Sequence, residues 1–199
     1  MLLHKKITRF LFLLLCSITT STLLADDYII ELLIFENLNR AGIEEQWVDK
    51  FQDAMNKTSA TLDANWQSAS SYQLSNVRAA LKRSGTHRPL LHTAWRQTVN
   101  KQRRSVQLPE STLSKSSATI TGNVTVTKGR YLHLDLDLLL HAEPDTTYIG
   151  TDYRLGSQSN VIKLQQKRRM RSKELHYIDH PRFGVLAIIT PLELKDSSD

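Results

Sequence analysis

Two consecutive segments with strict alternation of apolar and polar residues constrain the fold of this chain most. Between 118 and 127, Ile120, Val124 and Val126 alternate with threonines and one asparagine, and between 131 and 140 a leucine occupies every even position from 132 onward. A period of two places the apolar side chains on one face of a β-strand and the polar ones on the other. The two segments therefore predict an antiparallel hairpin with one face on a core and one in solvent.

The apolar pattern also predicts the register of this hairpin, because directly opposed residues share a face. A two-residue turn would oppose apolar to polar residues on both faces. A three-residue loop at 127–129 instead opposes Val124 to Leu132 and keeps the apolar side chains together. We predict this loop, with Gly129 in the left-handed conformation that such loops favour.

The polar face of the hairpin is the first candidate binding site. The predicted register aligns Asn123 with His133 and Thr121 with Asp135, so that hydroxyl, amide and carboxylate groups lie in a row suited to hydrogen bonding with a sugar. The simpler alternative is a solvated face on which Thr is favoured for its strand propensity. His133, Asp135 and Asp137 could also hold a cation, but nothing in the sequence supplies the remaining ligands. The residues of this candidate site are Thr121, Asn123, Thr125, Tyr131, His133, Asp135 and Asp137.

Hydrophobic periodicity predicts the other elements. Strands are expected at 28–35, 89–99, 161–170 and 185–189, and the first and last of these are nearly continuous apolar runs. Apolar residues spaced by three to four predict one helix starting at Ile43 and a second through Leu74, Val77 and Leu81. Ser71 is a candidate cap for the second helix, which should end at Ser84-Gly85.

Together these elements predict a single α+β domain at 26–199. It would consist of an antiparallel sheet of about five or six strands with two helices packed against it. Polar loops are expected near 100–117 and 143–160, where Ser, Thr, Asp and Gly are frequent.

The first 25 residues have the composition of a cleavable signal peptide. A basic start is followed by an apolar run from Phe10 to Ile18 and then by small polar residues. The apolar run is far shorter than the roughly 20 residues of a spanning helix, and no later segment approaches that length. Cleavage after Ala25 would remove Cys16, the only cysteine, and leave neither a thiol nucleophile nor a disulfide.

The distribution of charge and the absence of several catalytic motifs restrict the classes of function that remain. The formal net charge is +6, and the basic residues concentrate in 67–104 and 163–173, two stretches without an acid. For an exported chain, anionic envelope polymers or lipid head groups are better partners than nucleic acid, and a solvated charged face is the simpler alternative. The sequence contains no S-x-x-K or G-x-S-x-G motif, no P-loop and no dinucleotide fingerprint, and we predict neither a cofactor nor a resident metal.

Four segments of the chain resemble the CsiV-type periplasmic peptidoglycan-binding proteins of Gram-negative bacteria. The first is YIIELLIFEN from residue 28, followed by EQW from residue 45. The others are RPLLHTAWRQ from residue 88, GRYLHLDLDLLL from residue 129 and RRMRSKELHYIDHPRFGVLAIITP from residue 168. The resemblance implies a non-enzymatic accessory factor that supports cell-wall synthesis and cell shape. It further implies a class A penicillin-binding protein and its outer-membrane lipoprotein activator as partners.

The last of these segments supplies the leading candidate site, since polar loops on a scaffold often carry function. Its guanidinium groups would clamp stem-peptide carboxylates, and Tyr177 would stack on a sugar. Two alternatives stay open: Arg171, Glu174 and Asp179 pair only with one another, or His176, Asp179 and His180 serve a wall hydrolase or metal-dependent enzyme. Pro181 disfavours a helix through the two histidines. The candidates are Arg168, Arg169, Arg171, Glu174, His176, Tyr177, Asp179 and His180.

Overall fold

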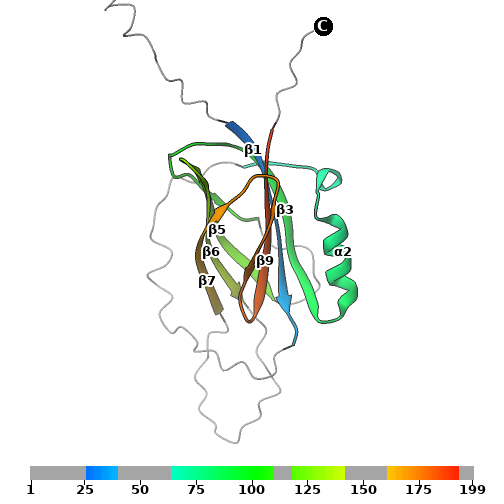
Figure 1. Ribbon diagram of the computed structural model, residues 1–199. Helices are drawn as coiled ribbons and strands as arrows, with labels where there is room; N and C mark the ends of the chain where they lie inside the picture. Colours follow the sequence, from blue (N-terminus) through cyan, green and yellow to red (C-terminus); the bar gives the residue numbers. More distant parts are fainter. Residues whose placement is uncertain (1–25, 40–63, 110–117, 142–160, 193–199) are drawn as a thin grey trace, which may run out of the picture.

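The computed structural model describes residues 26–39, 64–109, 118–141 and 161–192, and in these ranges the chain is mostly β (Figure 1). The predicted signal peptide, the helix expected from Ile43 and the loop expected at 143–160 lie outside the described residues. None of the helices in the described ranges has the length and hydropathy needed to cross a membrane.

Within the described ranges, nine strands form two antiparallel sheets. The first sheet has the order β2-β3-β1-β9-β8 and the second the order β4-β5-β6-β7. The first consists of β1 (Asp26–Asn37), β2 (Asn65–Trp66), β3 (His87–Val99), β8 (Leu175–Asp179) and β9 (Phe183–Pro191). The second consists of β4 (Ser105–Gln107), β5 (Thr119–Lys128), β6 (Leu132–His141) and β7 (Val161–Met170). A short 3-10 helix, Ala69–Ser71, precedes the α-helix α2, Ser75–Ser84.

The two sheets enclose one hydrophobic core. On β1, the fully buried Ile30, Leu32 and Ile34 face this core, and the even-numbered leucines of β6 face it from the second sheet. The chain passes between the sheets at 100–104 and at 171–174. Beside the first passage, the backbone N–H of Lys128 donates to the carbonyl of Asn100 at 2.8 Å, so the ends of β3 and β5 are joined.

The predicted fold class is wrong. One sheet covered by two helices was expected, whereas the described residues form two sheets and one α-helix. The physical reason is that the apolar face of the 118–140 hairpin is covered by another sheet rather than by helices. In addition, β4 lies within the stretch 100–117 that was expected to be a loop.

The hairpin β5–β6 confirms the predicted faces but not the predicted register. Its loop has three residues, but they are 129–131, and Val124 lies opposite Leu136 instead of Leu132. The shift is four positions, an even number, so every side chain stays on its predicted face. Gly129 does not have a positive φ; Gly122 within β5 does, at 141°.

Helix α2 covers the opposite side of the first sheet. Figure 1 shows it on one side of the layer formed by β1, β3 and β9, with β5, β6 and β7 on the other. Val77 and Leu81 of the helix, together with Leu74 at its N-cap, pack on Leu33 of β1 and Ile188 of β9. The predicted position of this helix is confirmed.

The ends of α2 are stabilised in different ways. It ends at Ser84, as predicted, and Gly85 follows in the left-handed conformation with φ 68°. Ser71 was expected to cap the first turn, but its hydroxyl donates to the carbonyl of Ser68. The backbone N–H groups of Gln73 and Leu74 instead donate to the carboxylate of Glu31 on β1, each at 2.8 Å.

Glu31 is a buried carboxylate, with 1% of its surface exposed. Its third partner is Nε2 of His92 on β3, at 2.8 Å. Burial raises the pKa of Glu31, but the hydrogen bonds from His92, Leu74 and Gln73 outweigh burial and hold this pKa below its ordinary value of 4.5. The ionised carboxylate therefore connects β1, β3 and the start of α2.

Replacing Glu31 with Gln should lower the free energy of unfolding by about 2 kcal/mol at neutral pH, because a buried ionised acceptor of three hydrogen bonds is lost. The folded-state pKa of Glu31 lies below 4.5. Its contribution is therefore complete above the unfolded-state pKa and is lost as pH falls through the folded-state value. Urea unfolding followed by circular dichroism should show a smaller acid-induced loss of stability in the variant than in the wild type.

The matched control is Asp27→Asn, also on β1. Hydrogen bonds from Thr98 and Arg96 lower the pKa of Asp27 as well, but its side chain is 27% exposed and its ion pair with Arg96 lies at the surface. Solvent weakens such pairs, so this variant should lose less stability than Glu31→Gln. Equal losses would contradict the special role of the buried carboxylate.

Gly122→Ala should destabilise the second sheet by roughly 3 kcal/mol or more. A Cβ atom at this position would lie 2.2 Å from the backbone oxygen of Asp137, and φ is 141°. Gly129→Ala is the control, because its Cβ would meet nothing within 4 Å. Thermal unfolding should separate the two variants; similar melting temperatures would contradict the close backbone approach.

A polar sheet face as the candidate binding site

The outer face of the second sheet is formed by the side chains that point away from the core. Alternation along β5, β6 and β7 places the odd-numbered residues on this face, and strand pairing aligns them into rows that cross the sheet. Two full rows cross all four strands. They are Ser105, Thr125, Asp135 and Lys167, and next to it Gln107, Asn123, Asp137 and Gln165.

The second of these rows, hereafter the amide row, contains Gln107, Asn123, Asp137 and Gln165. The three amide side chains are exposed, and the carboxylate of Asp137 is 40% exposed. Within the described ranges, no residue hydrogen-bonds the side chains of the three amides. An amide offers both donors and an acceptor, so this row can exchange hydrogen bonds with neighbouring hydroxyl groups.

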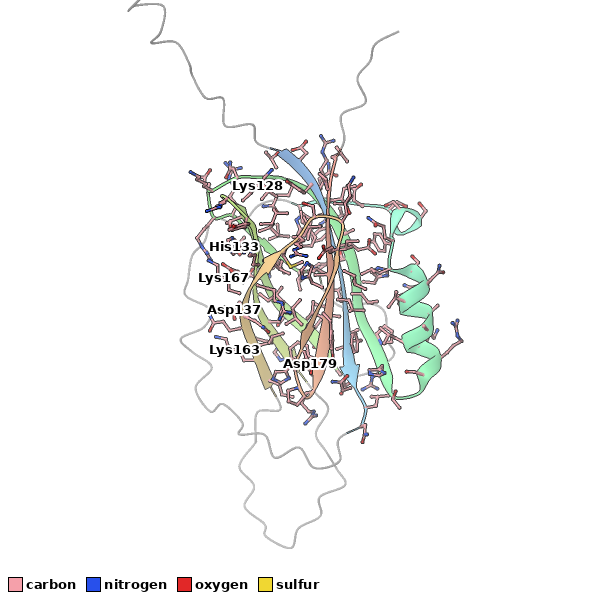
Figure 2. The ribbon with its side chains drawn as sticks, viewed as in Figure 1. Lys128, His133, Asp137, Lys163, Lys167 and Asp179 are labelled. Carbon is pink, nitrogen blue, oxygen red and sulfur yellow. The ribbon has the colours of Figure 1, made fainter. Side chains whose placement is uncertain are left out.

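Three cationic side chains of β7 lie on the same face: Lys163 and Lys167 flank Gln165 of the amide row, and Arg169 lies one row beyond Lys167. Figure 2 shows Lys163 and Lys167 along the same flank of the molecule as His133 and Asp137, whereas Asp179 belongs to β8 of the first sheet. Lys163 lies 3.6 Å from the carboxylate of Asp137. In the part of the chain that the structure describes, neither Lys167 nor Arg169 has an acidic partner, and both are exposed. These two residues, hereafter the cation pair, are therefore open to an anionic ligand.

Near the 129–131 loop, the face carries an exposed aromatic ring and several polar side chains that are already bonded or buried. The guanidinium of Arg169 lies 3.3 Å from the centre of the Tyr131 ring, a cation–π contact, and Tyr131 is 38% exposed. Nearby, Arg103 binds the carboxylate of Asp135 at 2.7 Å. Thr125, opposite Asp135, is only 8% exposed and shares a hydrogen bond with Ser105.

The structure brings most residues of the predicted hairpin face together. Asn123, His133, Asp135 and Asp137 lie on one face, as the alternation predicted, although the opposed pairs differ. Thr125 is buried. The hydroxyl of Thr121 is engaged with Nε2 of His141 at 3.0 Å. The open part of the face is therefore centred on the amide row and the cation pair.

The arginine-rich segment does not form the single loop that was expected. It consists of the end of β7, a turn at 171–174 and strand β8. Arg169 points to the outer face of the second sheet. Arg168 lies opposite Leu134 and points to the other face of the sheet, but it is exposed because β7 is an edge strand. Tyr177 and Asp179 lie on the first sheet, and His176 alternates with them. The predicted residues are thus spread over several surfaces.

Local partners account for much of this segment. Arg171 and Glu174 form an exposed pair at 3.5 Å, as the structural alternative proposed, but Asp179 accepts a hydrogen bond from the hydroxyl of Tyr177. Burial and the carboxylate of Asp179 raise the pKa of Tyr177 to about 12. The Tyr177 ring also stacks on Phe35, with 6.2 Å between ring centres.

The three residues considered for a metal or hydrolytic site have separate partners. Nε2 of His176 accepts from the backbone N–H of Arg171, and Nδ1 of His180 accepts from that of Arg182. Among the residues with described positions, no three His, Cys, Asp or Glu side chains are grouped to hold an ion.

Several residues of the face were not predicted from the sequence. The candidates did not include Lys163, Gln165 and Lys167, because the predicted strand 161–170 was not paired with the hairpin. They also did not include Gln107, because a loop was expected there. The alternation of Ile162 and Leu164 with these polar residues was the available signal. The short strand β4 gave no such signal.

Comparisons with known proteins were made for the whole chain. Neither the curated proteins nor the solved structures gave a match. A family model does match, and it covers residues 8–192, which include every strand described above. The chain therefore belongs to the family of CsiV peptidoglycan-binding proteins.

Proposed function

We propose that this chain is a non-enzymatic accessory factor that binds peptidoglycan in the periplasm through the outer face of its second sheet. The family supports the ligand. The observation that supports the site is an open face on which unbonded amides lie beside two cations without acidic partners, within the described residues. Sugars offer hydroxyl and amide groups, and stem peptides add carboxylates, so both kinds of side chain have a counterpart in the wall.

The proposed cellular role follows from the sequence and the family together. The N-terminal segment would direct export and be removed, leaving the protein in the periplasm of a Gram-negative cell. There it would support wall synthesis and cell shape by acting with a class A penicillin-binding protein and its outer-membrane lipoprotein activator. The outer surface of the first sheet, with exposed Leu175 and Tyr177, lies on a different side from the proposed wall-binding face and leaves room for such a partner.

Arg169→Glu should weaken binding to washed peptidoglycan sacculi about tenfold or more, because it replaces an exposed cation of the face with an anion. Co-sedimentation at several protein concentrations measures this, and binding should weaken as salt increases. Lys167→Glu is a second variant with the same expected result.

The matched control is Arg171→Glu, which makes the same charge change two residues away. Arg171 lies in the turn beside Glu174, outside the polar face, so its variant should bind sacculi nearly as well as the wild type. Equal weakening by both substitutions would indicate general charge attraction and contradict the proposed face.

The non-enzymatic role predicts that sacculi incubated with the protein release no muropeptides above a buffer control. Chromatography of the supernatants from the same tubes measures this, with a known wall hydrolase as positive control. Release that depends on His176, Asp179 or His180 would contradict the proposal and favour the alternative enzyme. Failure of the wild type to pellet would favour a protein that reaches the wall only through its partner.

A further inference from the structure

The outer face of the second sheet has two chemically different parts, and the difference indicates which part of the wall polymer each one contacts. Successive strands in a sheet lie about 4.8 Å apart, so the amide row extends over roughly 14 Å across four strands. The cation pair lies at one end of this row, on edge strand β7, with its two residues about 7 Å apart along the strand.

The amide row suits neutral groups and disfavours anions. Its only charged member is Asp137, whose carboxylate would repel an anionic ligand group, although Lys163 lies 3.6 Å away and offsets part of this charge. The exposed amides of Gln107, Asn123 and Gln165 donate and accept equally well. Sugar hydroxyl and acetamido groups match this chemistry.

The cation pair suits carboxylates. The nearest acid on the facing strand, Asp135, lies opposite Lys167 but binds Arg103 at 2.7 Å. This leaves Lys167 and Arg169 without an acidic partner among the described residues. Arg169 is also held against the ring of Tyr131, which fixes the plane of its guanidinium and reduces the entropy lost when it binds a carboxylate in a two-pronged manner.

We propose that the amide row binds the glycan and that the cation pair binds free carboxylates of the stem peptides, so that the protein selects peptide-bearing wall. This assignment rests on the proposed function, because it divides the same face into two subsites. It predicts that the carboxylates contribute a separable part of the affinity.

The test compares two forms of the same wall: washed sacculi, and sacculi whose carboxylates have been converted to methylamides with a carbodiimide and methylamine. Conversion keeps the sugars and the peptides but removes the negative charges. The wild-type protein should bind methylamidated sacculi about tenfold more weakly than untreated sacculi in co-sedimentation. Lys167→Gln/Arg169→Gln should bind both forms equally, at the level of the wild type on methylamidated sacculi.

Two further double variants complete the design. Asn123→Ala/Gln165→Ala should weaken binding to both forms of sacculi by a similar factor, because it removes amides from the glycan subsite. Arg171→Gln/Lys173→Gln removes two cations from the turn and should retain the preference of the wild type. Thermal unfolding of each variant shows whether it is folded, and all six substituted side chains are exposed.

The outcomes separate the two proposals. If the wild type binds both forms of sacculi equally while Asn123→Ala/Gln165→Ala weakens binding, the carboxylate assignment is wrong and the binding face stands. A cation-pair variant that keeps the wild-type preference for untreated sacculi would also overturn the assignment. If the wild type binds neither form, the proposed function itself fails.

Discussion

The burial of β1 on both of its faces is the constraint on which the other parts of this fold depend. Its even-numbered residues, Ile30, Leu32 and Ile34, complete the core between the sheets, and Leu33 on the other face receives helix α2. A strand covered on both sides must be central, and β1 pairs with β3 and β9 along nearly its whole length. The one ionised side chain at its centre, Glu31, is tolerated because three donors converge on it, two of them backbone N–H groups of the residues that directly precede α2.

The same arrangement explains why the proposed binding face lies on the second sheet. One face of the first sheet is covered by the core and part of the other by α2, whereas the second sheet uses only one face for the core. Its other face is therefore free to carry polar side chains, which alternation then places in regular rows. In β5 to β7, one alternating pattern places the apolar residues in the core and the polar residues between them on the outer face.

Period-two alternation allowed the sequence to predict faces, but not which sheets the strands would join. The leucines of β6 had to be buried, and the odd-numbered residues had to be exposed, whatever covered the core. The covering layer could not be deduced, because a helix and a second sheet bury an apolar strand face equally well. The predicted register was wrong by four positions for a related reason, because any even shift keeps the apolar residues of the two strands opposite each other. The close approach of Gly122 to the backbone of Asp137 is a feature of the observed pairing that the apolar pattern does not contain. Similarly, dense charge in the 168–180 segment suggested one site, although alternate residues of a strand point to opposite sides.

A sheet face suits an extended polymer for a physical reason that a loop does not share. Rows such as Gln107, Asn123, Asp137 and Gln165 are spaced by the hydrogen-bonded backbone, so no backbone entropy is lost when several of them contact a ligand at once. Each contact to a sugar or a carboxylate is weak in water, and affinity must come from many contacts made together. The wall presents the same chemical groups at repeated intervals, so a rigid face can rebind a neighbouring unit whenever it releases one. Rigid spacing and a repetitive ligand together favour binding through many weak contacts spread over an open face.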